Sequence, residues 1–361
     1  MAEKVLMKGN EALAEAALRA GCRFYSGYPI TPQTEILEYL STRMAEVGGF
    51  FIQAESELCG INMVYGAAST GARAFTTSSG PGYSLKQEGI SYLAANDLPA
   101  VIIDVMRIGS GLGDIFMGQG DYWQITRGGG HGDYRTIVLA PNSVQENVDI
   151  VQTAFDLADK YLHPVIIASD AGIGQMMEPV ELPDFKEEDR SQHDWWRVRG
   201  NASGEANDAH KVCNVYYKMW DPNFCEQVGY TDYPTYLRDK YAAIEENEQR
   251  WESYMVEDAE AVLVAYGSSS RVAKETVNRA RAQGFKLGLI RPITLWPFPV
   301  KAFAEAKAAK AFCTVEVNIL GQMKDDVEAA VKHSIPVGFV GDFFEVPNPD
   351  VIIEYVKGML K

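Results

Sequence analysis

The segment FIQAESELCGINMVYGAASTG, residues 51–71, sets two acids, Glu55 and Glu57, where a short apolar stretch turns into a helix of small residues. One acid in the first turn of a helix is favoured by the helix dipole. A second acid beside apolar neighbours such as Ile61 and Met63 needs another explanation. A carboxyl group shielded from water has a raised pKa, so it can hold or donate a proton at a heterocyclic nitrogen. The segment therefore predicts acid–base chemistry.

A proline-rich turn, GYPITP at residues 27–32, follows an expected strand. Pro29 and Pro32 restrict the backbone on both sides of Thr31, which would hold its hydroxyl outward at a rigid loop tip. In open parallel sheets, ligands bind beyond the carboxyl ends of the strands. The alternative is a stiff turn in which Thr31 caps the next helix.

A second turn, TSSGPGYSL at residues 77–85, contains Gly80 and Gly82, which allow a ligand or the next helix to come close to the backbone. The turn is not a P-loop, because no G-x-x-x-x-G-K-[ST] pattern occurs in the chain. The alternative is an ordinary connection between a strand and a helix.

A glycine-rich segment, residues 106–135, follows the most apolar expected strand and is typical of a functional loop. Arg107 stands at the end of that strand, where its guanidinium could bind a carboxylate through two hydrogen bonds. The alternative is a structural ion pair with Asp114 or Asp121. His131 is a possible acid or base, but alone it is expected to be structural.

The elements that must position these residues alternate between strand and helix, which predicts an α/β fold with a parallel sheet covered on both faces. We expect one such domain over residues 1–180 and a smaller α/β domain over residues 256–361. Residues 181–255 are expected to be an ordered linker that ends in a helix over 235–255. A further helix is expected over 299–310.

Composition restricts the class of protein. The chain has 361 residues, a formal net charge of -16 and five cysteines. The acidity argues against nucleic acid and anionic membranes as partners. The cysteines form no C-x-x-C pair, and no signal or membrane-spanning segment is recognisable, so a soluble protein of the reducing cytoplasm is expected.

Three patterns are missing from the sequence. The chain has no GDG followed about thirty residues later by Asn, the pattern that carries magnesium and diphosphate in thiamine enzymes. It has no G-x-G-x-x-G motif opening a helix after a strand with a ribose-binding acid. It has no cysteine cluster for an iron–sulfur centre or a metal, so no metal site is predicted on this chain.

The motifs together resemble the alpha subunit of the 2-oxoacid:ferredoxin oxidoreductases, with the nearest resemblance to the 2-oxoisovalerate branch. The resemblance is carried by SGYPITPQTEI, QAESELCGINMVYGAASTGARAFTTSSGPG, KQEGISYLAANDLP, QGDYWQITRGGGHGDYR and VLAPNSVQE, and more loosely by LIRPITLWPFP. It implies an N-terminal domain similar to the pyrimidine-binding domain of thiamine enzymes. It also implies a C-terminal domain similar to that of transketolase.

The resemblance also implies roles for individual residues. Glu57 corresponds to the glutamate that hydrogen-bonds the aminopyrimidine ring of thiamine diphosphate, Thr31 to a threonine near substrate and cofactor, and Arg107 to an arginine that binds the substrate carboxylate. The implied cofactor-binding residues are Glu57, Tyr28, Pro29, Ile30, Gly80, Pro81 and Gly82.

Further chains are implied as partners. A beta subunit would share the thiamine diphosphate and carry Mg²⁺ and a [4Fe-4S] cluster, gamma and ferredoxin-like delta subunits would complete the complex, CoA would be a co-substrate, and ferredoxin would accept electrons. The expected reaction is oxidative decarboxylation of a 2-oxo acid to acyl-CoA. A 2-oxoglutarate enzyme, which would need a second cation such as Arg127 or Arg135, remains an alternative, as do a pyruvate or aryl-pyruvate enzyme and a non-catalytic scaffold.

Two segments depart from the family pattern. The strand that ends at Arg107 continues as Ile108-Gly109-Ser110, where relatives usually have Gly-Gly-Pro, close to the expected substrate pocket. The segment 184–232 is long and rich in aromatic residues, and it is expected to cover a partner subunit or narrow the entrance to the site.

Overall fold

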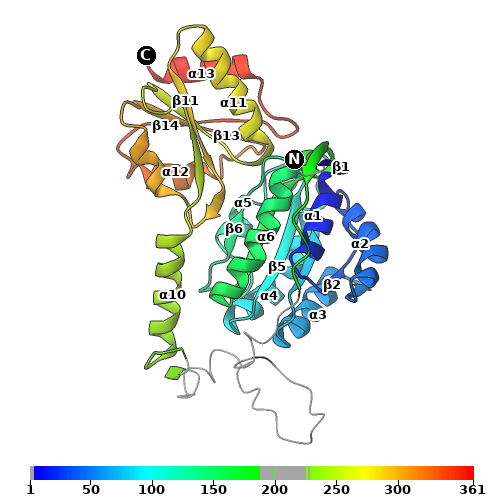
Figure 1. Ribbon diagram of the computed structural model, residues 1–361. Coiled ribbons are helices and arrows are strands. Elements are labelled where there is room, and N and C mark those ends of the chain that lie inside the picture. Colours follow the sequence, from blue (N-terminus) through cyan, green and yellow to red (C-terminus); the bar gives the residue numbers. More distant parts are fainter. Residues whose placement is uncertain (1–3, 188–196, 198–224, 227) are drawn as a thin grey trace, which may run out of the picture.

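The computed structural model describes residues 4–187, 197, 225, 226 and 228–361 (Figure 1). Most of the aromatic segment 184–232 lies outside the described residues, and so does its expected role.

The larger sheet has seven strands in the order β12-β6-β7-β5-β4-β2-β3. Every neighbouring pair is parallel except β12 and β6, which are antiparallel. All seven residues of β5 and all seven of β7 are buried, as expected of strands covered on both faces. The strands are β2 (Phe24–Gly27), β3 (Phe50–Gln53), β4 (Ala74–Ser78), β5 (Ala100–Met106), β6 (Ile137–Leu139), β7 (Pro164–Asp170) and β12 (Thr294–Trp296).

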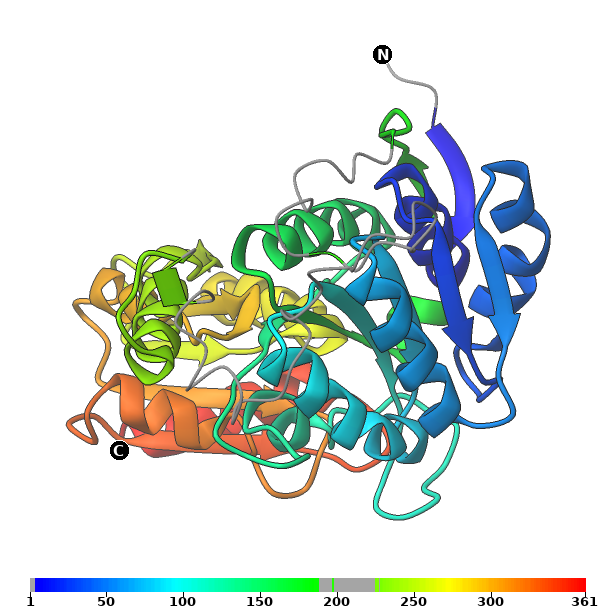
Figure 2. The same cartoon turned by 90° about the horizontal axis from the view of Figure 1, so that it is seen from below.

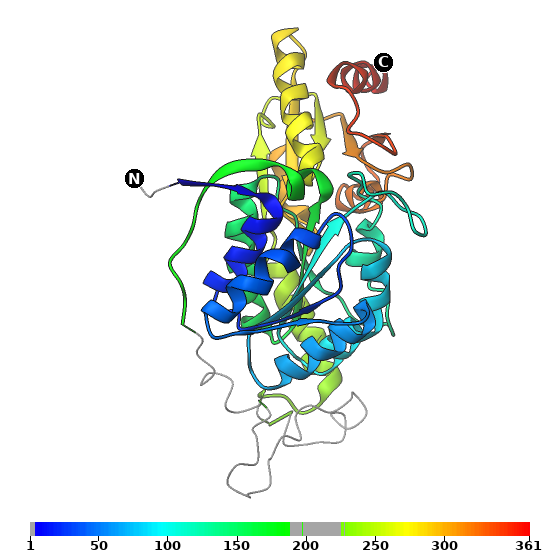
Figure 3. The ribbon, with the colours of Figure 1, turned by 90° about the vertical axis from the view of Figure 1, so that its right-hand side faces the viewer.

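Helices cover both faces of this sheet, as Figures 2 and 3 show. On one face α1 packs against both α2 and α6, and on the other α3 packs against α4. Several ends are fixed by side chains: Ser56 and Ser143 accept a backbone N–H at the starts of α3 and α6. The helices are α1 (Gly9–Arg19), α2 (Thr34–Glu46), α3 (Glu57–Ser69), α4 (Pro81–Ala95), α5 (Tyr122–Thr126), α6 (Val144–Tyr161) and α7 (Ala171–Gln175).

The C-terminal part of the chain forms a second sheet of five strands in the order β14-β13-β10-β11-β9. Its strands are β9 (Trp251–Tyr254), β10 (Ala261–Val264), β11 (Leu287–Pro292), β13 (Ala311–Glu316) and β14 (Val337–Gly341). Its helices are α11 (Gly267–Ala282), α12 (Lys324–Ala330), α13 (Pro349–Met359) and the 3₁₀ helix η2 (Val300–Glu305), and helix α10 (Tyr233–Asn247) precedes the sheet. A separate two-stranded ladder joins β1 (Lys4–Lys8) to β8 (Met177–Glu181).

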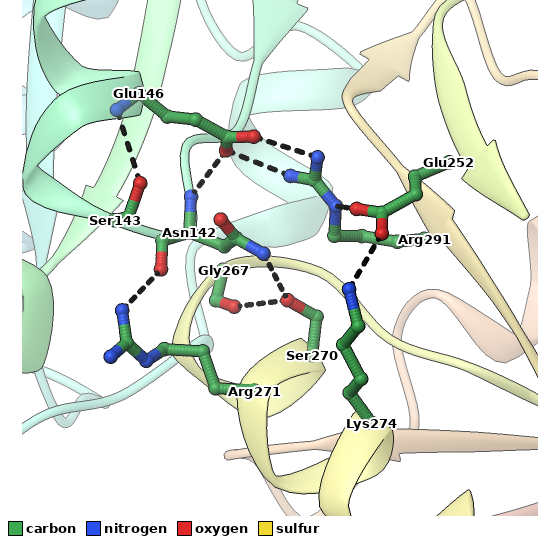
Figure 4. Close-up of polar contacts among 9 residues, drawn as sticks. All are labelled: Asn142, Ser143, Glu146, Glu252, Gly267, Ser270, Arg271, Lys274 and Arg291. Atoms are coloured by element: carbon green, nitrogen blue, oxygen red, sulfur yellow. Dashed lines mark hydrogen bonds and ion pairs between the residues drawn. The ribbon is translucent and has the colours of Figure 1, made fainter. Parts of the chain in front are cut away.

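Polar side chains connect the two sheets. Arg291 from β11 donates both terminal nitrogens to Glu146 of α6, at 2.8 Å each, and its Nε to Glu252 of β9 at 3.0 Å (Figure 4). Gln119 is fully buried, donates to the carbonyl of Tyr266 and accepts from the backbone of Val317. The C-terminal part is therefore packed on α6 and on the loop that follows β5.

Two secondary-structure predictions are wrong. The helix expected over 235–255 ends at Asn247, and β9 then pairs antiparallel with β11, because an edge position in the sheet was open to it. The helix expected over 299–310 is the short 3₁₀ helix η2, which starts after Pro299. In the described residues no helix is long and apolar enough to cross a bilayer, and no three or more His, Cys, Asp or Glu side chains cluster as metal ligands.

Candidate functional site

Glu57 is the first residue of α3, directly after the capping Ser56, and its side chain is 6% exposed. Glu55 lies two residues earlier and is exposed. The two acids therefore have different environments, as the sequence suggested: Glu55 lies in water, and Glu57 is buried at the carboxyl edge of the sheet. No hydrogen bond to the Glu57 carboxylate is found within the described part of the chain.

The turn between β4 and α4 lies directly against this carboxylate. A Cβ added to Gly82 would lie 2.5 Å from Glu57 Oε1 and 2.4 Å from Ser78 Oγ, distances that real side chains do not adopt. Gly80 has a φ of +46°, which favours glycine, and Pro81 begins α4. The missing side chain at Gly82 therefore leaves the space that the Glu57 carboxylate occupies.

The proline turn brings Thr31 to the same edge. Its side chain is exposed, as expected for a residue at a loop tip, while Pro29 and Ile30 are half-buried and Tyr28 is 37% exposed. The alternative role of Thr31 as a helix cap is wrong, because α2 begins at Thr34 and its N-cap residue is Gln33, which accepts no side-chain capping bond.

Arg107 contacts both turns. Its side chain is 6% exposed, and its two terminal nitrogens donate to the carbonyl oxygens of Thr31 and Leu112, each at 2.7 Å. Its Nε is buried without a hydrogen-bond partner, and a Cβ on Gly80 would lie 3.7 Å from it. The alternative of an ion pair with Asp114 or Asp121 is not observed, because Arg107 makes no salt bridge within the described residues.

Two buried acids lie near Arg107. Burial raises the pKa of Asp104 well above its usual value, the charge of Asp121 adds to this, and the charge of Arg107 opposes it. Burial also raises the pKa of Asp121. Because neither acid is directly paired with Arg107, its positive charge is not fully neutralised and can attract an anion. Asp104 was not expected at the site, although an acid inside the apolar strand PAVIIDVM indicates a buried carboxyl group.

Two hollows flank the loop after β5. One of about 390 Å³ is lined by Thr31, Ile115 and Phe116, among others. The other, of about 710 Å³, is lined by Gly80, Pro81, Asp121 and residues of the C-terminal part. Leu112, Ile115 and Phe116 are exposed by 80%, 53% and 60%, so the loop beside Arg107 presents apolar side chains.

Other residues considered from the sequence lie elsewhere. Arg127 forms an ion pair with Asp326 at 3.0 Å, and Arg135 donates to the carbonyl of Thr126. Both line a separate hollow with Trp296. His131 is exposed on the loop between α5 and β6. None of the three contacts Glu57, Thr31 or Arg107 among the described residues.

The residues at the sheet edge fit the pyrimidine part of thiamine diphosphate. A ring nitrogen needs a buried acid whose oxygens make no other hydrogen bond, and Glu57 is such an acid. The ring must also come close to the backbone, and the Gly80–Gly82 turn allows this. The unpartnered Oγ of buried Ser78 adds a further polar group at the same place. The described residues include no diphosphate-binding motif, so the edge fits only part of the cofactor.

Two family models match the chain. Residues 15–227 match the thiamine diphosphate-binding domain of pyruvate flavodoxin/ferredoxin oxidoreductases, and residues 259–343 match core domain II of pyruvate:ferredoxin oxidoreductase.

Individual proteins are similar over most of the chain. Ketoisovalerate oxidoreductase subunit VorB of Methanothermobacter marburgensis is 53% identical over 326 residues, which cover 90% of this chain and 89% of that protein. A 2-oxoglutarate:ferredoxin oxidoreductase of Magnetococcus marinus, solved with 2-oxoglutarate, coenzyme A and succinyl-CoA bound, superposes with a TM-score of 0.83 at 26% identity, over 100% of this chain and 66% of that one. A split-gene transketolase shares the fold, with a TM-score of 0.58 at 13% identity over 98% of both chains. The predicted fold class is confirmed.

Proposed function

The chain belongs to the 2-oxoacid:ferredoxin oxidoreductase family, and we propose that it supplies the pyrimidine half of a shared thiamine diphosphate site for a branched-chain 2-oxo acid. It is a subunit of an oxidoreductase, in a family that uses thiamine diphosphate, CoA and iron–sulfur clusters on partner subunits. A division into residues 1–180, 181–255 and 256–361 belongs to the proposal. So do beta, gamma and delta partner subunits, ferredoxin as acceptor, and a cytoplasmic location.

The observation that carries the proposal is the buried, unpartnered Glu57 carboxylate against Gly82. Thiamine diphosphate, when bound, supplies a carbon that attacks the 2-oxo group and stabilises the charge left by loss of CO₂. Glu57 would hold a proton at the ring nitrogen, because the residue is largely buried (6% exposed) and its carboxylate is free of other hydrogen bonds among the described residues. Tyr28, Pro29, Ile30 and the Gly80–Gly82 turn would enclose the ring.

Arg107 would orient the substrate. Its partly uncompensated charge suits the carboxylate that all 2-oxo acids share, and the exposed residue Thr31 is bound to it through the backbone carbonyl. Leu112, Ile115 and Phe116 suit an apolar substrate side chain. The 53% identity to a ketoisovalerate oxidoreductase subunit supports the same choice.

The two arginines suggested for a 2-oxoglutarate enzyme do not lie at the site. A second carboxylate would need a second positive group near Arg107, but Arg127 is engaged by Asp326 and Arg135 lies in the same separate hollow. A second cation would have to be a residue other than Arg127 and Arg135.

The test is Glu57→Gln in the assembled complex, with Glu55→Gln as the matched control. We expect normal assembly and a loss of turnover of about 10²- to 10⁴-fold for Glu57→Gln, the range of an acid–base group, and little change for the exposed Glu55. Unchanged turnover in Glu57→Gln would favour a scaffold without a catalytic role.

The substrate is tested with the same assembled wild-type complex. Steady-state rates are measured with 2-oxoisovalerate, 2-oxoglutarate, pyruvate and phenylpyruvate. We expect the highest kcat/KM with 2-oxoisovalerate, because an apolar side chain fits beside Ile115 and Phe116. A preference for 2-oxoglutarate would overturn the branched-chain assignment and show that a cation other than Arg127 or Arg135 binds the second carboxylate.

A further inference from the structure

A lysine is buried directly behind the acid of α3. Lys86, on α4, is fully buried, and its ammonium group donates to Thr76 Oγ1 at 3.0 Å and to the backbone carbonyl of Glu57 at 3.3 Å. Lysine is almost never fully buried unless it is paired, because its charge must leave water. The burial of Lys86 therefore indicates a role other than packing.

Two glycines lie where α3 and α4 come close together, at Glu57 and at Lys86. Lys86 follows Gly82 by four residues, so both face the same side of α4. The Gly82 backbone makes room for the Glu57 carboxylate, and a Cβ added to Gly60 of α3 would lie 3.4 Å from Lys86 Nζ. The ammonium group thus lies beside the first turn of α3, one helical turn along α4 from the position where α4 meets the acid.

The charges of the two side chains act on each other. Burial lowers the pKa of Lys86 to about 8, and the negative charge of Glu57 opposes that change. Thr76, the contact from β4, is neutral, so Glu57 from α3 is the one charged group of the described residues that acts on Lys86. Lys86 is therefore mostly protonated at neutral pH, and its charge reaches Glu57 through a region shielded from water.

We propose that Lys86 is a positioning residue for Glu57, which fixes the first turn of α3 through its carbonyl oxygen and sets a compensating positive charge behind its carboxylate. The role of Glu57 at the cofactor rests on the proposed function. The contact between the two residues does not, and it can be tested without catalysis. Lys86 lines neither of the two hollows beside the loop after β5, so its proposed effect is on Glu57 and not on the substrate.

The first test compares the thermal stability of the full chain with that of Lys86→Met over a range of pH. The pKa of about 8 lies below the ordinary value of 10.5, so the unfolded chain binds more protons than the folded chain between these two values. Wild-type stability therefore rises across this window relative to the variant. We expect Lys86→Met to have the higher Tm at pH 7 and the difference to shrink from about pH 8 to 10.5. A lower Tm at pH 7 with no pH dependence would show a packing role only.

The second test measures coupling between the two side chains. In a Glu57→Gln background Lys86 has lost its attractive partner, so Lys86→Met is expected to raise the Tm at pH 7 by more than it does in wild type. In a Glu55→Gln background the two shifts are expected to add. Additive shifts with Glu57→Gln would overturn the proposed pairing, whatever the turnover of that variant.

The third test follows catalysis in the assembled complex. Lys86→Met and Lys86→Gln, which keeps a donor without a charge, are both expected to lower kcat about tenfold and to leave KM for the 2-oxo acid unchanged. The reason is that Lys86 contacts the first turn of α3 and not the substrate, so its loss misplaces Glu57 in the transition state without weakening substrate binding. An unchanged kcat in both variants would contradict the proposal. Normal turnover of Glu57→Gln would instead reject the proposed function and leave the coupling test to decide the role of Lys86.

Discussion

At the scale of single residues, the site depends on how far each charge is shielded from water. Glu55 and Glu57 are two residues apart, yet Glu55 is exposed and Glu57 is buried, with only 6% of its surface exposed. The sequence predicted that one acid would be unusual, because its neighbours are apolar. It could not predict the burial of Lys86, since burial of a single charged residue on a helix depends on contacts between different elements.

Arg107→Met tests the substrate clamp. We expect KM for the 2-oxo acid to rise and kcat/KM to fall about 10- to 100-fold, the usual effect of losing a hydrogen bond to a charged group. Steady-state kinetics of the assembled complex measure this. Arg127→Met is the matched control and should leave KM unchanged, because Arg127 is paired with Asp326 away from the site. Equal effects of the two substitutions would remove Arg107 from the site.

At the scale of elements, the site lies at one edge of the sheet. It is formed by the turns after β2 and β4, the end of β5 and the first turn of α3. β2, β4 and β5 are parallel neighbours, so the turns that follow them meet at their carboxyl ends. The strand and helix periodicity predicted β2, α3, β4, α4 and β5 within a few residues, because these elements are strongly apolar or regular. The short elements β9 and η2 were not predicted, because tertiary contacts rather than the local sequence pattern determine their secondary structure.

Gly82→Ala tests the contact between α4 and α3. The added Cβ would meet Glu57 Oε1 at 2.5 Å, so we expect the carboxylate to be displaced and kcat of the assembled complex to fall about 10²-fold, as small misplacements of catalytic groups do. Gly66→Ala on α3 is the control: an added Cβ meets nothing within 4 Å, and the chain should become more stable by about 0.5–1 kcal/mol without losing activity. Full activity of Gly82→Ala would show that the close contact has no catalytic role.

At the scale of the whole molecule, the proposal is that this chain supplies the acid for a cofactor whose phosphates a partner subunit holds. The sequence predicts this division, since it has no GDG motif and no cysteine cluster. The C-terminal part packs on the loop after β5 through Gln119 and on α6 through Arg291. Neither contact could be predicted, because each joins residues more than a hundred positions apart. The Gln119 contacts hold the loop that follows Arg107, and this loop lines both hollows.

The central claim is that Glu57 of this chain meets a ring that a partner subunit anchors. The most direct measurement is a structure of the assembled complex with thiamine diphosphate bound. We expect a pyrimidine nitrogen within hydrogen-bond distance of a Glu57 carboxylate oxygen, with the diphosphate and its metal ion held by another subunit. A ring that lies away from Glu57, or a diphosphate held by this chain, would contradict the account.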